Sequence, residues 1–401
     1  MVILAGLGGT MSHANAIDTL GYGRKIFNED HDAFRDTVRR FFRQEVEPNV
    51  RQWQEDGFFP ADLFKAAGRA GILASGIPAQ YGGGGGDFLH HAILYEEHGY
   101  SPGGVVLEGG LTVDTVAYAL LNDGTEEQKR EWLPRFAAGE VIGEVGVTEP
   151  SSGSDPRSMK TWARRDGGDW VINGSKMWMT NGPLTTMLIV AARTGEESGG
   201  RGAVTMFIVP MDTKGVTRSK PTELMLKSAG GVAQFQFDDV RVPARNILGG
   251  EAGRGMSSAL KTITTARLAL CARMVAACEL AFHTTVDFVK NRHAFGQTVF
   301  DFQNTQFKLA SVKTEIAVAR SYLDDLLLQC VSAKIDPVQG AMAKLWCSEM
   351  EGRVMDECLQ LHGGAGFADE YIISKLYAFA RVHRIYLGTS EIQRLTIARS
   401  I

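Results

Sequence analysis

Residues 146–155 (GVTEPSSGSD) form one of two dense groups of residues that could do chemistry. The segment reads as the end of a strand, followed by Pro150 and a run of small polar residues. Exposed N–H and hydroxyl groups in such a segment can bind an oxygen-rich ligand. An ordinary turn has the same composition, so this segment alone leaves both interpretations open.

The second group lies towards the C-terminus, where residues 360–367 (QLHGGAGF) are followed by residues 384–393 (RIYLGTSEIQ). Glycine lets the backbone approach a ligand closely, and arginine binds phosphate or carboxylate groups. The alternative interpretation is a helix end and a loop that precedes a last helix.

Several common signatures of chemistry are absent from the sequence. It contains no GxGxxG after a strand, no GxxxxGK[ST], no HExxH and no GxSxG, which argues against a P-loop, a zinc protease and a hydrolase elbow. His90, His91 and His98 share a helical stretch with Glu96 and Glu97. A metal site is one interpretation of that stretch, but we expect a solvated helix face.

Composition limits the class of protein. The 401 residues are enough for several packed units, and 44% hydrophobic with 22% charged residues is typical of a globular chain. A formal net charge of −4 without a long basic run argues against nucleic acid as a partner.

Cysteine use and the N-terminus bear on location. The five cysteines lie in the last third without a CxxC pair, so we expect no zinc site, no disulfide framework and a cytoplasmic protein. Residues 1–11 are apolar but short and lack a basic start, so we expect neither export nor membrane insertion.

The apolar pattern changes twice along the chain. It is helical from about residue 28 to 142, with a capping box at residues 125–128 and a glycine loop at residues 81–87. Strand patterns follow, including residues 170–180, where Asn173-Gly174 predicts a hairpin turn. Further strands are expected at residues 188–191, 204–209 and 235–242, and long helices at residues 256–291, 303–333, 336–361 and 370–383. Strands do not alternate with helices, so a doubly wound sheet is disfavoured.

Together with Trp178, Thr180 and Asn181, and with residues 292–297 (RHAFGQ) leading to Gln303, these motifs resemble the acyl-CoA dehydrogenase family. The resemblance covers the chain from about residue 28 onward. It implies an α+β fold: an N-terminal extension (1–27), an N-terminal α-helical domain (28–142), a central antiparallel β-barrel-like domain (143–250) and a C-terminal four-helix bundle (251–401).

The resemblance also implies FAD as the cofactor and an acyl-CoA thioester as the substrate. It assigns the following residues to FAD: Val147, Thr148, Trp178, Thr180, Arg292, Phe295, Gln303, Gln360, Gly363, Gly364, Thr389 and Glu391. Substrate contacts are implied for Ser154, Arg267, Leu387 and Gly388. Electron-transfer flavoprotein as acceptor and a homo-oligomer, dimer or tetramer, are implied as partners.

The sequence departs from the family at the catalytic base. Family members oxidise an acyl-CoA to 2-enoyl-CoA, and a glutamate removes the α-proton. That glutamate precedes either the Gly-Thr of the C-terminal motif, where this chain has Leu387, or the arginine of the first C-terminal helix, where it has Ala266. Neither side chain accepts a proton, and Glu108 and Asp114 are the remaining candidates.

Three explanations therefore stay open. The chain could oxidise an acyl-CoA with another or a removed base. It could run a base-free flavin reaction on a CoA thioester, namely enoyl reduction, elimination or monooxygenation. It could also be a catalytically silent subunit that binds FAD and CoA.

Overall fold

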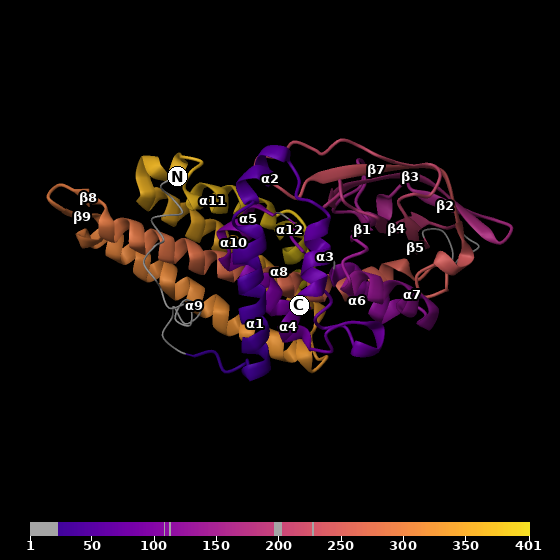
Figure 1. The fold of residues 1–401 in the computed structure, drawn as a ribbon, viewed down its shortest axis with the longest axis horizontal. Coiled ribbons are helices and arrows are strands. Elements are labelled where there is room, and N and C mark those ends of the chain that lie inside the picture. The colour runs from indigo at the N-terminus through magenta and orange to yellow at the C-terminus, as the bar shows by residue number, and fades with distance from the viewer. Residues whose placement is uncertain (1–22, 108, 112–113, 196–202, 227) are drawn as a thin grey trace. The chain divides into compact units, whose positions relative to one another are not determined.

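The computed structural model describes residues 23–107, 109–111, 114–195, 203–226 and 228–401. The chain packs as two compact units (Figure 1). Unit 1 contains Met1–Asp36, Ala92–Val105 and Arg267–Ile401, and unit 2 contains Thr37–His91 and Val106–Ala266. Glu108 and most of the 1–27 extension lie outside the described residues.

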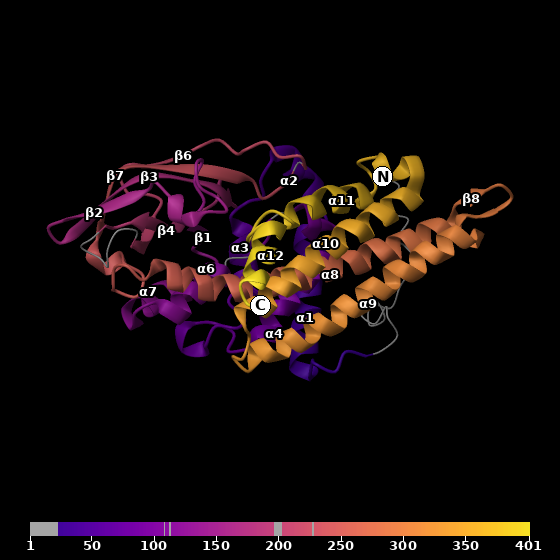
Figure 2. The ribbon, with the colours of Figure 1, turned by 180° about the vertical axis from the view of Figure 1, so that it is seen from behind.

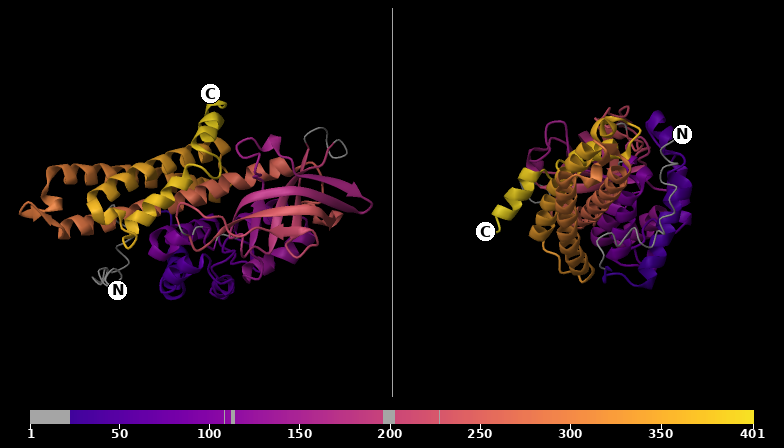
Figure 3. Two further views of the ribbon diagram at one scale, coloured as in Figure 1. Left: turned by 90° about the horizontal axis from the view of Figure 1, so that it is seen from above. Right: turned by 90° about the vertical axis from the view of Figure 1, so that its left-hand side faces the viewer.

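Unit 2 is organised around a seven-stranded curled sheet (Figure 3). Its strands are β1 (Gly143–Gly146), β2 (Trp162–Asp166), β3 (Asp169–Thr180), β4 (Met187–Arg193), β5 (Val204–Pro210), β6 (Val216–Arg218) and β7 (Val232–Pro243). They lie in the order β1-β4-β2-β3-β7-β6, and β5 pairs with β4. Most neighbours are antiparallel, as expected, whereas β1 and β2 pair with β4 in parallel.

Alternate residues of a strand point to the same side of a sheet, and on one side of this sheet these residues are apolar. The buried set includes Leu188, Val190 and Ala192 of β4 and Phe235 and Phe237 of β7. The core therefore fixes the register of β3, which carries Trp178 and Thr180.

The predicted hairpin at Asn173-Gly174 is wrong. These residues lie inside the single strand β3, at a bulge where the pairing with β7 shifts. The Asn173 side chain bonds the backbone and side chain of Asp239 instead of closing a turn. A Cβ at Gly174 would lie 2.4 Å from Oγ1 of Thr161, so the glycine serves close packing. The hairpin turn lies one step earlier, between β2 and β3.

The helices of the N-terminal half follow the sequence patterns. They are α1 (Glu29–Phe41), a π-helical turn (Phe42–Val46), α2 (Val50–Asp56), α3 (Asp62–Arg69), α4 (Phe88–Tyr100), α5 (Pro102–Val106), α6 (Asp114–Asp123) and α7 (Glu126–Ala137). The capping box is confirmed, since Thr125 and Gln128 exchange hydrogen bonds at the start of α7. Residues 82–87 form the expected glycine loop.

Unit 1 is helical (Figure 2). Its main helices are α8 (Gly255–Asn291, which enters the unit at Arg267), α9 (Gln303–Val331), α10 (Pro337–His362), α11 (Ile372–His383) and α12 (Ser390–Ala398). A small hairpin of β8 (His293–Ala294) and β9 (Gln297–Thr298) joins α8 to α9. Helix α10 packs against α9, α11 and α12, and its Met350 contacts Cys278 of α8.

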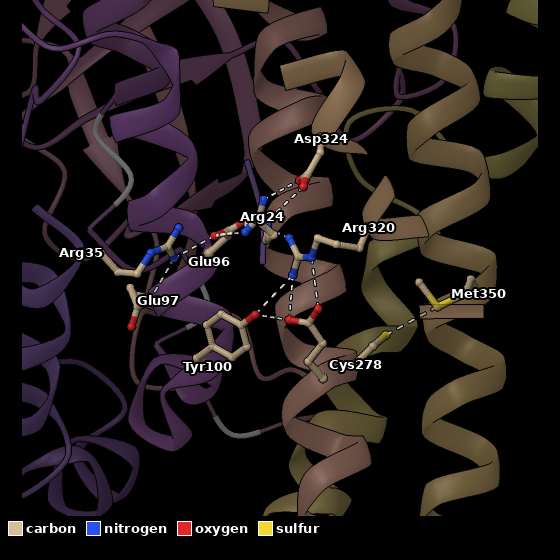
Figure 4. A network of polar contacts seen from close by, with 10 residues as sticks. Arg24, Arg35, Glu96, Glu97, Tyr100, Cys278, Arg320, Asp324 and Met350 are labelled. Carbon is tan, nitrogen blue, oxygen red and sulfur yellow. Dashed lines mark hydrogen bonds and ion pairs between the residues drawn. The ribbon is translucent and has the colours of Figure 1, made fainter. Parts of the chain in front are cut away.

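The solvated helix face expected around Glu96 is wrong. His98, Glu96 and Glu97 of α4 are all buried. Glu96 bonds Arg24, Arg35 of α1 and Arg320 of α9, as Figure 4 shows. Charged residues are rarely buried unless they are paired, and here the partners come from segments far apart in the sequence.

Two further observations concern the whole described chain. All five cysteines are free thiols. Within the described ranges, no helix is both long and apolar enough to cross a membrane.

Candidate functional site

The loop after β1 is held by a buried lysine. Nζ of Lys176 on β3 donates to the Val147 carbonyl at 3.1 Å and to Oε1 of Glu149 at 2.7 Å. The Thr148 carbonyl accepts from the Met177 N–H at 3.0 Å. Among the described residues, the N–H groups of Val147 and Thr148 have no hydrogen-bond partner. The loop therefore offers two free donors on a backbone whose acceptors are already bonded.

Glu149 anchors the same loop as an ionised group. Its carboxylate also accepts from the N–H groups of Lys160, at 2.6 Å, and Thr161, at 3.0 Å. Burial alone would raise the pKa of Glu149, but Lys176 and these N–H donors lower it below its usual value. Burial lowers the pKa of Lys176, an effect that Glu149 opposes.

Trp178 sits in a strained and exposed position on β3. A second bulge falls between Lys176 and Met179, and Trp178 there has a φ of +64° and is 51% exposed. Such a backbone angle is rare for a large residue and recurs at ligand sites. The indole is half exposed at this bulge, so part of its surface is open to a ligand.

Thr180 ends the same strand close to the segment before α6. A Cβ at Gly109 would lie 2.1 Å from Cγ2 of Thr180, so only glycine fits there. The next residue, Asn181, has a φ of +53° and donates from Nδ2 to the Gly110 carbonyl at 3.1 Å. The backbone of Val147 and Thr148 thus bonds Lys176 and Met177 of β3, the strand that also carries Trp178 and Thr180. Ser154 lies exposed in the following loop.

In unit 1, the turn of Leu387 and Gly388 is held from three helices. The Leu387 carbonyl accepts from Nε of Arg267 on α8 at 3.1 Å and from Nε2 of Gln393 on α12 at 3.0 Å. The Gly388 carbonyl accepts from Nζ of Lys344 on α10 at 2.8 Å and from Nε2 of Gln393 at 2.9 Å. We call this pair of residues the 387–388 turn.

The 387–388 turn has left-handed backbone angles, with φ of +53° at Leu387 and +91° at Gly388. In the part of the chain that the structure describes, neither N–H of the turn has a hydrogen-bond partner. Thr389 then caps α12 by accepting from the Ile392 N–H, and Glu391 is exposed in its first turn. The turn therefore presents free backbone donors while its acceptors are bonded.

The residues implied for the FAD diphosphate and adenosine lie at the other end of these helices. Phe288 of α8 stacks on His362 of α10, with ring centroids 4.4 Å apart. This contact brings the end of α8, before Arg292, to the end of α10, before Gly363. Phe295 is 97% exposed on the small hairpin, and Arg292, Gln303, Gln360, Gly363 and Gly364 are exposed as well.

Each unit, taken by itself, offers groups that suit part of a flavin dinucleotide. Val147 and Thr148 offer free N–H donors, Trp178 offers an indole face, and a Cβ at Gly363 or Gly364 would meet nothing within 4 Å. Open glycine backbone beside an exposed arginine suits a diphosphate.

The catalytic base is not found at either family position. Leu387 belongs to the 387–388 turn, and Ala266 lies buried in α8 directly before Arg267. Glu108 lies outside the described residues, and Asp114 opens α6 with a side chain outside the described set.

Sequence reasoning missed the roles of four residues, Glu144, Lys176, Lys344 and Gln393, of which Gln393 was named only as the end of the 384–393 segment. Lys176 and Lys344 are 0% exposed, which no local pattern indicates, because their partners lie 27 and 44 residues away. Glu144 lies on β1, where burial raises its pKa to about 7. The only signal for Glu144 in the sequence was its position as a charged residue between two glycines of a strand.

Comparison with known proteins agrees with this architecture. Family models match residues 28–140 (acyl-CoA dehydrogenase, N-terminal domain), 145–240 (middle domain) and 253–401 (C-terminal domain). The long-chain specific acyl-CoA dehydrogenase of Rattus norvegicus mitochondria is 39% identical over 94% of this chain and 88% of that protein. The probable acyl-CoA dehydrogenase YngJ of Bacillus subtilis is 35% identical over 93% and 98%.

Solved structures are similar as well. An acyl-CoA dehydrogenase from Geobacillus kaustophilus has a TM-score of 0.89 at 34% identity and covers 94% of this chain and 99% of its own. A glutaryl-CoA dehydrogenase from Mycobacterium smegmatis in complex with FADH2 has a TM-score of 0.85 at 31% identity, covering 94% and 95%. The chain belongs to the acyl-CoA dehydrogenase family, whose members are FAD-dependent oxidoreductases acting on CH–CH groups.

Proposed function

We propose that this protein oxidises an acyl-CoA thioester to the 2-enoyl-CoA. The observation that carries the proposal is the 387–388 turn, whose two N–H groups have no partner in the described part of the chain and whose carbonyls are each held by two donors. Such preorganised donors suit a thioester oxygen that gains negative charge during α-proton loss. Arg267, Leu387 and Gly388 are the substrate contacts in unit 1, and Ser154 is the contact in unit 2.

FAD, when bound, supplies a hydride acceptor. Val147 and Thr148 would bind the flavin through their free N–H groups, Trp178 would cover its face, and Thr180 would bond its edge. Arg292, Phe295, Gln303, Gln360, Gly363 and Gly364 would bind the diphosphate and adenosine, with Thr389 and Glu391 near the other end. These residues position the flavin and exclude water, which is what hydride transfer requires of the protein.

The α-proton needs an acceptor other than residues 266 and 387. Glu108 and Asp114 are the candidates in the segment that follows α5. Leu387 and Ala266 favour a second function in which no α-proton is removed: enoyl-CoA reduction, elimination or monooxygenation on a CoA thioester. A catalytically silent subunit that binds FAD and CoA is the other alternative.

Partners form part of the same proposal. Phe295 and Phe367 are 97% and 90% exposed. Such exposed aromatic side chains support a dimer or tetramer in which a second copy of the chain covers them. Electron-transfer flavoprotein is the proposed acceptor. Free cysteines support a reducing compartment such as the cytoplasm. The three-domain division at residues 142/143 and 250/251 belongs to this proposal too.

Anaerobic titration of the FAD-loaded protein with straight and branched acyl-CoAs tests the function through the visible absorbance of the flavin. Bleaching by one class of acyl-CoA is expected and would identify the substrate class. If no acyl-CoA bleaches the flavin, oxidation is excluded. Enoyl-CoA added to chemically reduced protein then separates the reductase from the silent subunit, and oxygen uptake by the reduced protein with acyl-CoA detects a monooxygenase.

A further inference from the structure

Lys344 is a buried cation that bonds no carboxylate among the residues that the structure describes. Its side chain is 0% exposed, and Nζ bonds the Gly388 carbonyl. Arg267, which bonds the Leu387 carbonyl, is buried as well, at 6% exposure. Within the described residues, no ion pair joins either cation to an acid. Burying a charge without an opposite charge is costly, so this arrangement needs a reason.

The fold alone does not require the two cations. Gln393 donates to both carbonyls of the 387–388 turn, so each would keep a hydrogen bond if its cation were replaced. A neutral amide therefore satisfies the turn. Lys344 and Arg267 add positive charge, which the amide lacks, next to the backbone that carries the two free N–H groups.

The neighbouring acids are already engaged elsewhere. Glu351 bonds His383 at 2.6 Å, and Glu349 accepts from the Ser390 hydroxyl at 2.6 Å and lies near Arg384. Glu391, on α12, is exposed to solvent. On α8, burial raises the pKa of Cys271 well above its usual value, so this thiol beside Lys344 is neutral. The positive charge at the turn is therefore not cancelled by a bonded group.

We propose that Lys344 is a positioning residue that makes the 387–388 turn selective for a thioester carrying negative charge on its acyl oxygen. The inference rests on the proposed function, because it concerns the thioester end of an acyl-CoA. The side chain of Lys344 is 0% exposed, and its Nζ bonds backbone of the turn. It acts through the Gly388 carbonyl and through its charge, which in a low-dielectric interior is felt strongly across the turn.

This role explains how the site can favour an enolate-like thioester although Leu387 replaces a carboxylate. A glutamate at position 387 would place a negative charge beside the two cations. With leucine there, the charge of Lys344 and Arg267 is available to the ligand.

Equilibrium binding to the FAD-loaded protein tests the inference without turnover. The probes are pairs of CoA thioesters of equal chain length, from short to long: a saturated acyl-CoA, and the 3-ketoacyl-CoA, which ionises to an enolate. The variants are Lys344→Met and Lys344→Gln, of which the glutamine keeps a neutral donor near Gly388. Lys334→Met removes one charge from an exposed site and is the matched control.

Lys344→Met and Lys344→Gln are expected to weaken 3-ketoacyl-CoA binding by about tenfold to a hundredfold and to leave the saturated acyl-CoA nearly unchanged. The melting temperature should stay level or rise, because a buried unpaired charge is removed. Lys344→Arg should restore the preference, and Lys334→Met should match wild type.

A pH series gives an independent readout. Burial lowers the pKa of Lys344 to about 8, so its charge is present below that pH and lost above it. At each pH, the affinity of wild type for 3-ketoacyl-CoA is divided by that of Lys344→Gln, so that ionisation of the ligand cancels. This ratio should fall towards one as pH rises through about 8.

If the neutral variants weaken the binding of both ligands equally, or if both variants lose binding together with melting temperature, Lys344 is structural and the inference is overturned. If wild type binds neither CoA ligand, the proposed function fails instead. If wild type binds both and the variants keep the same preference, the inference fails and the proposed function stands.

Discussion

Lys176 and Glu149 form an ion pair in the interior of unit 2, with 2.7 Å between Nζ and Oε1 and side chains 0% and 3% exposed. The pair connects β3, which carries Trp178, to the loop that carries Val147 and Thr148. Because Lys176 also bonds the Val147 carbonyl, one side chain holds the backbone on which the flavin is proposed to lie. Both parts of the proposed flavin site in unit 2 therefore depend on a single buried charge.

Replacing Lys176 with methionine should destabilise the protein and weaken FAD binding. The substitution leaves the Glu149 carboxylate buried without a cation, which costs about 3–5 kcal/mol in comparable ion pairs. Denaturant unfolding with and without added FAD measures both effects, since a bound ligand adds to stability. Lys160→Met is the control, because only its backbone N–H contacts Glu149. Equal unfolding midpoints for Lys176→Met and wild type would contradict this account.

Glu144 should make the protein less stable as pH rises towards neutrality. Burial raises the pKa of Glu144 from 4.5 to about 7, so the folded protein keeps a proton that the unfolded chain releases between these values. Stability therefore falls from pH 4.5 to about 7 and is then constant for this group. Glu144→Gln, which stays neutral, should flatten that part of the profile and raise the melting temperature at pH 8.

Melting temperatures of wild type and Glu144→Gln between pH 4 and 9 check this. Glu140→Gln, an exposed change before β1, is the control and should follow wild type. Parallel wild-type and Glu144→Gln profiles would show that the folded protein does not retain the proton.

Glu96 should dominate the acid stability of unit 1. Burial alone would raise its pKa, but Arg24, Arg35 and Arg320 together lower it to about 2 (Figure 4). The carboxylate thus contributes stability above pH 4.5 that is lost as pH falls from 4.5 to about 2. Glu96→Gln should lower the free energy of unfolding by about 3–5 kcal/mol at pH 7, because three arginines, of which Arg35 and Arg320 are buried, lose their shared partner.

Asp324→Asn is the matched comparison for Glu96→Gln. Asp324 is 16% exposed and pairs with Arg24 alone in the network, so its loss should cost less. Acid-induced unfolding of the three proteins, followed by circular dichroism, gives the order. If the stability of Glu96→Gln falls as steeply with decreasing pH as that of wild type, Glu96 does not have the assigned role.

The sequence predicted those features that follow from local patterns. The capping box at Thr125 follows from the Thr-x-x-Gln pattern. The long helices α8 to α10 repeat apolar residues at helical spacing, so their positions were correct within a few residues. The prediction of a turn at Asn173-Gly174 failed because the pairing of β3 with β7 overrides the turn preference of these residues.

Partnerships between distant residues could not be predicted. Glu96 looked like a surface residue because its three arginines come from elsewhere in the chain. Lys344 and Gln393 converge on the 387–388 turn only after α10 and α12 have packed. The site residues named from motifs remain proposals, whereas side chains that bond their backbone, such as Lys176 and Lys344, could not be named from the sequence.

Restoring a carboxylate at a family base position tests whether the rest of the site is that of an oxidising enzyme. Leu387→Glu places the acid in the turn, next to backbone donors and near Arg267 and Lys344. Ala266→Glu places it one residue before Arg267 on α8. A positioned general base contributes about 10²- to 10⁴-fold, so at least one variant should raise the rate of flavin reduction by acyl-CoA by that order.

Leu387→Gln and Ala266→Gln are the controls, since they add similar bulk without a proton acceptor. The rate with the glutamate variants should rise with pH as the new carboxyl ionises, and the glutamine variants should show no such gain. Because Lys344 and Arg267 favour the ionised form, Glu at position 387 should titrate below its usual pKa. If neither glutamate exceeds its glutamine counterpart, a missing base is not what limits this protein, and the base-free reactions or a silent subunit become the better description.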